Sequence, residues 1–476
     1  MAMIPRQALR SGSKLLSRYA STGVAALELK PRATSVLLPP PTNFSKLGNG
    51  IRVASENHGG SLVTVGFWLD AGSRFERAHE SGASHLLENL FFEATANRNP
   101  EKLAADLGKL TYTVDGYTGR ENMALFAVCY PKDVDQVFEL LSEMLLKPSF
   151  SEEHVRNAKS NVFKRLEAME DDPRTILDHY MHAQGYQGTQ LERPPTGRHS
   201  VLQNVSAEDL KLFHRNNLQG HRIVVSAVGD IDHNRLHDLA NHHLGKVTND
   251  YVDEIPELTA SRYTSSFVYH REDSWPYCYA MLAAEAPGWE NVDEMITLKL
   301  ASKILGYWDK AHEAYESSPF RLAHRLGSTH TTRLYDSFYL PYCRTGLWGI
   351  YFVGIPSKTD SLTTDVLREW KYLGTLASDR DVEMGRNFMK TELMQGVESS
   401  PAAADELGRH ILRYNRHLSV PFLMDKVDKV DVDKLKKTCT KYLYDCDPLI
   451  TAFGQVAHLE FDHYWTIKWK TYWFLK

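Results

Sequence analysis

The fold of this chain is decided by one stretch, Gly82-Ala83-Ser84-His85-Leu86-Leu87-Glu88-Asn89-Leu90-Phe91-Phe92. From Ala83 onward its apolar residues recur at i, i+3, i+4, i+7 and i+8, the stripe by which an amphipathic helix faces a core. A second face carries His85, Glu88 and Asn89 at helical spacing. The stretch therefore predicts a helix that buries one side and gathers an imidazole, a carboxylate and a carboxamide on another.

These polar residues come close to a zinc-binding motif. A helix written His-x-x-Glu-His offers two imidazoles to a metal ion, and its glutamate takes a proton from the metal-bound water. Here Asn89 stands in the position of the second imidazole. With 21 His and 60 acidic residues in 476, roughly two or three His-x-x-acid matches are expected by chance. Two occur, at His85 and His270, so the spacing alone does not distinguish a metal site from an ordinary polar helix face.

The size and composition of the chain exclude several classes of protein. Its 476 residues are too many for one core and predict about two to four domains. A net charge of −5, with Lys and Arg scattered along the chain, gives no electrostatic footprint for nucleic acid. The five Cys include no Cys-x-x-Cys pair, which fits reduced thiols in a non-secretory compartment. No run of 18 apolar residues predicts a membrane-spanning helix, so we expect any membrane association to be peripheral or through partners.

The N-terminal segment has the features of a mitochondrial presequence. Basic residues are interspersed with leucines, and no acidic residue precedes Glu28. Arg18 is the second residue before the bond between Tyr19 and Ala20. This position of arginine predicts cleavage of that bond and a presequence over residues 1–19. The alternative interpretation is a disordered basic tail. Residues 20–43, which contain a run of three prolines, are predicted to form an extended arm.

An internal repeat predicts the domain organisation. Residues 205–210 and 430–435 both look like capped helix starts and lie 225 residues apart. At the same offset, Leu218 matches Leu443, Val225 matches Ile450, Ala227 matches Ala452 and Gly229 matches Gly454. Each half is therefore expected to contain a helix, a turn and a strand that ends at glycine. We predict two similar domains, 44–245 and 262–476, joined by a polar linker at 246–261.

Several motifs, in the right order, resemble the pitrilysin-like inverzincins, a family of zinc metallopeptidases. Besides the His85 helix, they are Gly72-Ser73-Arg74-Phe75-Glu76, Tyr117-Thr118-Gly119-Arg120-Glu121, Tyr180-Met181-His182-Ala183 and Thr345-Gly346-Leu347-Trp348-Gly349. The resemblance covers about residues 44–476. It implies an α+β fold of two similar domains, each an antiparallel-rich mixed sheet with helices on one face, arranged as a clam shell.

The resemblance also implies that the peptidase centre is lost. In active members two histidines of the helix and a glutamate 76 residues after the second bind zinc, and the intervening glutamate is the general base. Those positions are His85, Asn89, Arg165 and Glu88 in this chain, and Ala158 replaces a further glutamate. Arg165 would place a permanent cation where the metal needs an anion. We therefore expect no catalytic residue, no metal and no cofactor, with Glu88 as the relic of the general base.

The side chain of Arg165 has two interpretations. It follows Val162 by three residues and precedes Met169 by four, so it lies near the apolar stripe of its predicted helix. A guanidinium directed inward needs a partner, and an ion pair with Glu88 across the former metal site would supply one. Alternatively, the long side chain extends outward to solvent.

Within the family, the resemblance is to core subunits of the respiratory cytochrome bc1 complex and to β subunits of mitochondrial processing peptidase. It implies a non-catalytic structural subunit on the matrix side of the mitochondrial inner membrane. Its implied partners are core protein 2, cytochrome b, cytochrome c1 and the Rieske protein within a dimeric complex. The aromatic tail, residues 463–476, suits docking on such partners or packing on its own domain.

Two other functions compete with this interpretation. One is a β-type processing peptidase subunit with an altered or inactive metal site, which the retained His85 and Glu88 favour. The other is the α-type partner of the peptidase, which carries a glycine-rich loop. Residues 316–328 contain one glycine, which speaks against the α-type assignment.

Overall fold

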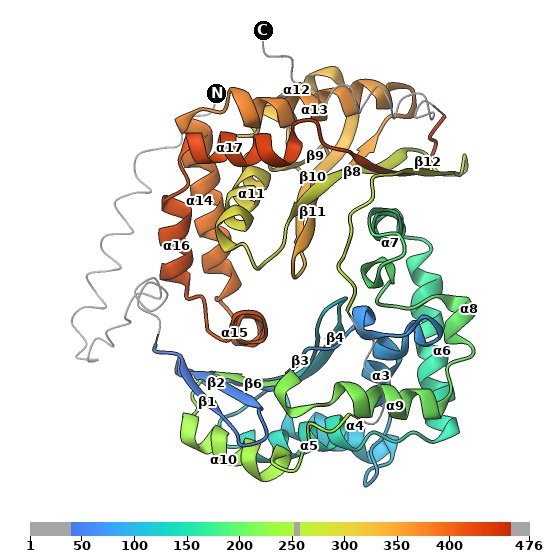
Figure 1. The fold of residues 1–476 in the computed structure, drawn as a ribbon, viewed down its shortest axis with the longest axis vertical. Coiled ribbons are helices and arrows are strands. Elements are labelled where there is room, and N and C mark those ends of the chain that lie inside the picture. The colour runs from blue at the N-terminus through green and yellow to red at the C-terminus, as the bar shows by residue number, and fades with distance from the viewer. Residues whose placement is uncertain (1–39, 252–257, 458–476) are drawn as a thin grey trace, which may run out of the picture. The chain divides into compact units, whose positions relative to one another are not determined.

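A computed structural model of the chain describes residues 40–251 and 258–457 (Figure 1). These residues belong to one compact unit. The predicted presequence, all but the last residues of the predicted arm, and the aromatic tail at 463–476 lie outside the described residues. Within the described ranges, none of the helices combines the length and the apolar character that crossing a bilayer requires.

The first half of the chain builds a six-stranded sheet in the order β1-β2-β6-β3-β5-β4. Strands β2 and β6 are parallel, and all other neighbours are antiparallel. The strands are β1 (Asn43–Lys46), β2 (Arg52–Glu56), β3 (Val63–Leu69), β4 (Thr113–Thr118), β5 (Met123–Cys129) and β6 (Ile223–Val228).

The second half builds a sheet with the same logic, in the order β7-β12-β8-β11-β10-β9. Its single parallel pair, β7 with β12, corresponds to β2 with β6. The strands are β7 (Phe267–Arg271), β8 (Cys278–Pro287), β9 (Tyr307–Asp309), β10 (Thr332–Pro341), β11 (Thr345–Gly354) and β12 (Leu449–Gly454). The predicted α+β class, with two similar antiparallel-rich mixed sheets, is confirmed.

The sequence repeat marks equivalent places in these two sheets. Helices α9 (Ala207–Asn217) and α17 (Val432–Leu443) are capped by Ser206 and Asp431, and they lead into β6 and β12. A glycine with positive φ follows β6 directly, Gly229 at 136°, and another is the last residue of β12, Gly454 at 91°. The other helices are α3 (Ala83–Phe91), α4 (Pro100–Leu110), α5 (Val134–Leu146), α6 (Glu152–Met169), α7 (Pro173–Gly185), α8 (His199–Leu202), α10 (His233–Leu244), α11 (Val292–Leu305), α12 (Arg321–Thr329), α13 (Thr359–Thr375), α14 (Asp379–Gly396), α15 (Ser400–Tyr414) and α16 (Val420–Asp428).

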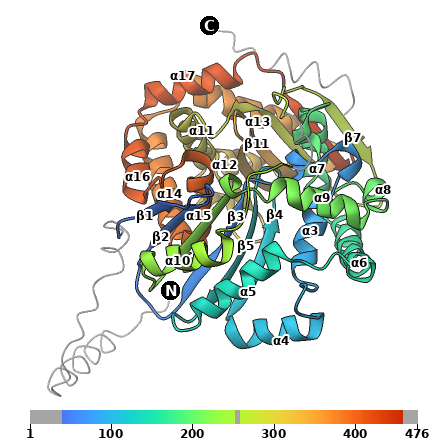
Figure 2. The ribbon, with the colours of Figure 1, turned by 60° about the horizontal axis from the view of Figure 1, so that its bottom comes forward.

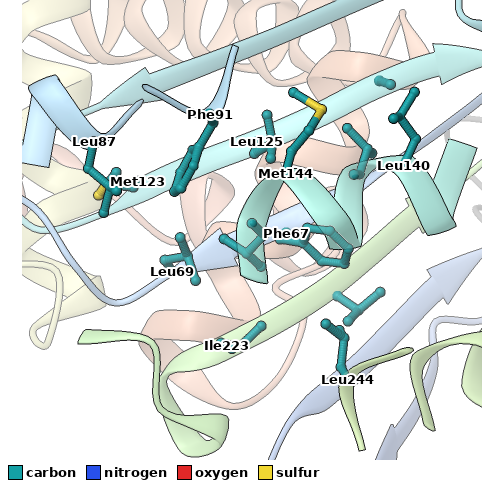
Figure 3. Packing of buried hydrophobic residues seen from close by; sticks show 14 of the residues in the cluster. Phe67, Leu69, Leu87, Phe91, Met123, Leu125, Leu140, Met144, Ile223 and Leu244 are labelled. Atoms are coloured by element: carbon teal, nitrogen blue, oxygen red, sulfur yellow. The ribbon is translucent and has the colours of Figure 1, made fainter. Parts of the chain in front are cut away.

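Strand β3 is buried on both faces, and its side chains alternate between two environments. Val65, Phe67 and Leu69 enter the main core of the first half, against α3, α5 and α10 (Figure 3). Phe67 meets Phe138 of α5 edge to face, with ring centroids 5.3 Å apart. Trp68 points to the opposite face, into a separate apolar cluster. The first sheet is therefore covered on both sides.

The second cover of each sheet comes from the other half of the chain. Helix α15 packs on β3 and β6, whereas α7 packs on β8 and β12 (Figure 1). The two halves thus exchange one helix each, an arrangement that adds to the predicted layer of helices on one face. Each exchanged helix contributes to the core of the other half. Without it, one face of that half's sheet would be uncovered.

The contact between α15 and the first sheet is close and specific. Gly408 lies against the indole of Trp68, where a Cβ would come within 2.3 Å of the ring. The Trp68 indole donates a hydrogen bond to Asp405 at 2.8 Å, and the Tyr117 hydroxyl donates to the same carboxylate oxygen at 2.7 Å. The Ser226 hydroxyl donates to a backbone carbonyl of α15 at 3.0 Å. Hydrogen bonds and apolar contacts therefore both hold α15 against the first sheet.

Candidate functional site

Helix α3 is held at its N-terminus by a buried carboxylate. Gly82 precedes the helix with a φ of 96°, and Glu76 faces the first turn from outside the helix. The Glu76 carboxylate accepts hydrogen bonds from the backbone N–H groups of Gly82 at 2.8 Å and Ser84 at 2.9 Å. It also accepts from the Ser84 hydroxyl at 2.5 Å. An acceptor at this end satisfies unpaired N–H groups and fixes where the helix begins.

This carboxylate predicts a pH dependence of stability. Burial raises the pKa of Glu76 from its ordinary 4.5 to about 7, although hydrogen bonds from Ser84 and Gly82 oppose the shift. The folded chain therefore holds this proton more tightly, so the stabilisation is complete below about pH 4.5 and is lost as the pH rises through about 7. We expect Glu76→Gln to gain about 3 kcal/mol relative to wild type across this range. Urea unfolding on both sides of the range measures the gain, and a constant difference would contradict it.

The polar face of α3 forms local hydrogen bonds. His85, Glu88 and Asn89 are all buried. The His85 Nδ1 lies 3.2 Å from the Glu88 carboxylate, and the Asn89 amide donates to the backbone carbonyl of His85 at 2.8 Å. Among the described residues, the His85 Nε2 has no hydrogen-bond partner. The predicted helix and its polar face are present, and the contacts of this face are made largely within the helix itself.

The predicted ion pair between Glu88 and Arg165 is not formed. Helix α6, which carries Arg165, packs beside α3 (Figure 2). In the described part of the chain, however, the Glu88 carboxylate contacts the His85 imidazole, and Arg165 is exposed. The reason is that an exposed guanidinium keeps its hydration, which an ion pair would partly remove. Ala158, about two turns before Arg165 in α6, is fully buried in the core.

Glu88, Asn89 and Arg165 nevertheless border one cavity of about 520 Å³ between α3, α6 and strand β4. Near its rim the Asn161 amide donates to the Glu93 carboxylate at 3.0 Å, linking α6 to the end of α3. Three of the four positions that the family resemblance assigns to the metal centre therefore border a polar, partly open cavity.

The residues at the expected ligand positions do not fit a zinc ion. Zinc sites need at least three protein ligands, and His85 is the one imidazole available among the expected positions. The Asn89 amide nitrogen is already used as a donor to the helix backbone, and Arg165 carries a permanent positive charge. In residues 40–251 and 258–457, no cluster of three or more His, Cys, Asp or Glu side chains is arranged to hold a metal ion.

A second polar site joins the two halves, and sequence reasoning did not identify its role. Glu121, which follows β4, accepts hydrogen bonds from the Trp289 indole at 3.1 Å and the Cys343 backbone N–H at 3.0 Å. Its carboxylate also pairs with Arg74. The partners lie up to 222 residues away along the chain. The spacing of residues within a helix or strand does not predict contacts over such separations, although the motif containing Glu121 was part of the family resemblance.

A buried histidine makes a similar connection. The His182 imidazole of α7 lies 2.6 Å from the hydroxyl of Tyr342; His182 is buried and Tyr342 is half-buried. Nearby, Arg120 pairs with Asp178 at 3.3 Å. Burial and the charge of Arg120 lower the pKa of His182 to about 4, so its imidazole is neutral at physiological pH. These groups fasten α7 to the second sheet.

Fold and site together define a class of protein. The chain has two similar α+β domains and a helix whose polar residues are spaced as in a metallopeptidase zinc motif. Asn89 and Arg165, however, occupy two of the positions where zinc ligands are expected. A profile described as "Insulinase (Peptidase family M16)" matches residues 52–197, and one described as "Peptidase M16 inactive domain" matches residues 204–389. The chain belongs to peptidase family M16.

Individual relatives include both peptidase and respiratory proteins. The chain is 32% identical over 428 residues to mitochondrial-processing peptidase subunit beta of Pongo abelii, covering 90% of this chain and 87% of the relative. It is 30% identical over 430 residues to human cytochrome b-c1 complex subunit 1, covering 90% and 89%. A chain in the solved structure of complex III2 from Candida albicans with Inz-5 bound matches with a TM-score of 0.81 and 21% identity, covering 91% of this chain and 100% of that one. This structural match supports the two-domain fold.

Proposed function

We propose that this chain is a core-1-type subunit of the mitochondrial ubiquinol-cytochrome c reductase (cytochrome bc1) complex, a non-catalytic scaffold for its assembly and stability. The polar face of α3 carries this proposal. Asn89 donates to the backbone of its own helix and Arg165 is exposed, so His85 alone remains of three expected ligands. Similarity to cytochrome b-c1 complex subunit 1 from human and mouse gives further support.

The proposal includes a location and partners. The chain would lie peripherally on the matrix side of the inner membrane after removal of residues 1–19. It would pair with core protein 2 and contact cytochrome b, cytochrome c1 and the Rieske protein in the dimeric complex. We also propose the domain limits 44–245 and 262–476, with residues 246–261 as linker, because each range contains one six-stranded sheet, apart from Asn43 at the start of β1.

Co-migration on a native gel tests the proposal. A tagged copy of the chain is expressed in its own mitochondria, the membranes are solubilised in mild detergent, and the tagged species is separated and its partners identified. We expect it to migrate with haem-containing subunits, and we expect its depletion to lower the amount of assembled complex. A tagged soluble matrix protein is the control. Migration as a soluble heterodimer without haem would contradict the proposal.

A β-type processing peptidase subunit is the second candidate. The retained His85 and Glu88, and the 32% identity to a peptidase β subunit, favour it. The purified chain, alone and with an α-type partner, is assayed for cleavage of a presequence peptide. Cleavage that Glu88→Gln abolishes, together with stoichiometric zinc, would replace our first proposal.

A further inference from the structure

A cavity of about 540 Å³ lies away from α3, where the first half, the end of the linker and helix α15 meet. Phe75 comes from the first half, whereas Trp289, Leu412 and Arg413 come from the second. This volume is in the range of sites that enclose small ligands. The cavity is therefore large enough for a bound molecule and is lined by both halves of the chain.

The charged groups around the cavity are paired, with one exception. Arg74 pairs with Glu121, Arg409 with Asp405 at 3.0 Å, and Arg344 with Glu290 at 3.6 Å. The acidic wall residue Asp70 lies 3.8 Å from Arg222. In the described part of the chain, Arg413 has no carboxylate within 4.0 Å. Among the described residues, the ion pairs around the cavity therefore leave the positive charge of Arg413 without a partner.

Arg413 is well placed to bind a ligand. It is half-buried and lines the cavity, and its guanidinium lies 5.8 Å from the ring centroid of Trp289. Burial and the neighbouring charge of Arg409 lower the pKa of Arg413, and the more distant charge of Glu121, which pairs with Arg74, opposes the shift. Arginine remains protonated in proteins, so the charge persists. A partly desolvated cation without a partner favours an anion.

The walls around Arg413 specify the rest of the ligand. Trp289, Leu412 and Phe75 line the same cavity as Arg413, and the guanidinium of Arg222 lies over the Phe75 ring, 4.3 Å from its centroid. The planar guanidinium fork matches a carboxylate, and the single unpaired charge calls for a single anionic group. We propose that this cavity binds a monocarboxylate on an apolar stem, with the carboxylate on Arg413 and the stem along Trp289 and Leu412.

Such a group has two sources, a free carboxylic acid or an acidic residue of a peptide. Isothermal titration calorimetry of the full chain at neutral pH compares 3-phenylpropionate with 3-phenylpropionamide, and a capped Phe-Glu-Phe tripeptide with its Phe-Gln-Phe counterpart. We expect the acid to bind about tenfold or more tightly than the amide in at least one pair. Preference in the first pair alone identifies a small molecule, and preference in the second alone identifies a peptide.

Matched variants locate the binding site. Arg413→Gln should remove the preference for the acid, and Arg413→Lys, which keeps the charge but loses the fork, should retain part of it. Arg416→Gln makes the same charge change at an exposed residue just beyond α15 and should leave the preference intact. The inference is overturned if neither acid binds at millimolar concentration, if acid and amide bind equally, or if the preference survives in Arg413→Gln. It does not depend on the proposed respiratory role.

Discussion

Replacing Gly408 with alanine is expected to lower the free energy of unfolding by about 1–3 kcal/mol. The added Cβ would lie 2.3 Å from the indole of Trp68, well inside van der Waals contact. The indole has no room to retreat, because it is fully buried, stacks on Phe126 at 6.0 Å between ring centroids, and donates to Asp405. The strain must therefore lift α15 from the first sheet, which disturbs the contact between the two halves.

Thermal and urea unfolding of the variant measure this effect, and Gly108→Ala is the matched control. Gly108 lies within α4, and a Cβ there would meet nothing within 4 Å. The same substitution should stabilise that helix by about 0.5–1 kcal/mol because alanine restricts the unfolded chain more than glycine does. If both variants change stability in the same direction, the close contact at Gly408 does not have the role argued for it.

The sequence could predict what depends on neighbouring residues. The apolar stripe from Ala83 to Phe91 gave α3 within its observed bounds, because helical periodicity is a local property. The capping residues Ser206 and Asp431 marked equivalent helices, and through them the two similar sheets. The family resemblance supplied the rest of the fold class.

What remained unpredicted depends on residues that are distant in the chain. Helices α7 and α15 each pack on the sheet of the other half. Through α15, Trp68 contacts a glycine 340 positions later in the chain, and no pattern in either segment predicts this contact. The bonds of Glu121 to the second half have the same character. The prediction of an ion pair for Arg165 failed for a different reason. Its place near an apolar stripe suggested an inward guanidinium, but a long flexible side chain can reach solvent from such a position.

Restoring the missing ligands should restore metal binding. The double variant Asn89→His/Arg165→Glu is expected to bind about one zinc ion per chain, whereas the wild type and both single variants should bind none stoichiometrically. Positions 89 and 165 border the same cavity as Glu88, on helices that already pack together, so the backbone is arranged to bring the new ligands toward His85. The change also removes a positive charge whose repulsion opposes the metal.

Zinc content after dialysis against a weak chelator measures the gain. His85→Ala added to the double variant should abolish it, because a site with two ligands falls below what zinc requires. Circular dichroism establishes whether each variant is folded. Stoichiometric zinc in the wild type would show that the cavity holds metal through other groups and would weaken the case for a lost centre. A folded double variant that stays free of zinc would show instead that more than these two ligands separates this chain from an active peptidase, and that the α3–α6 spacing itself has changed.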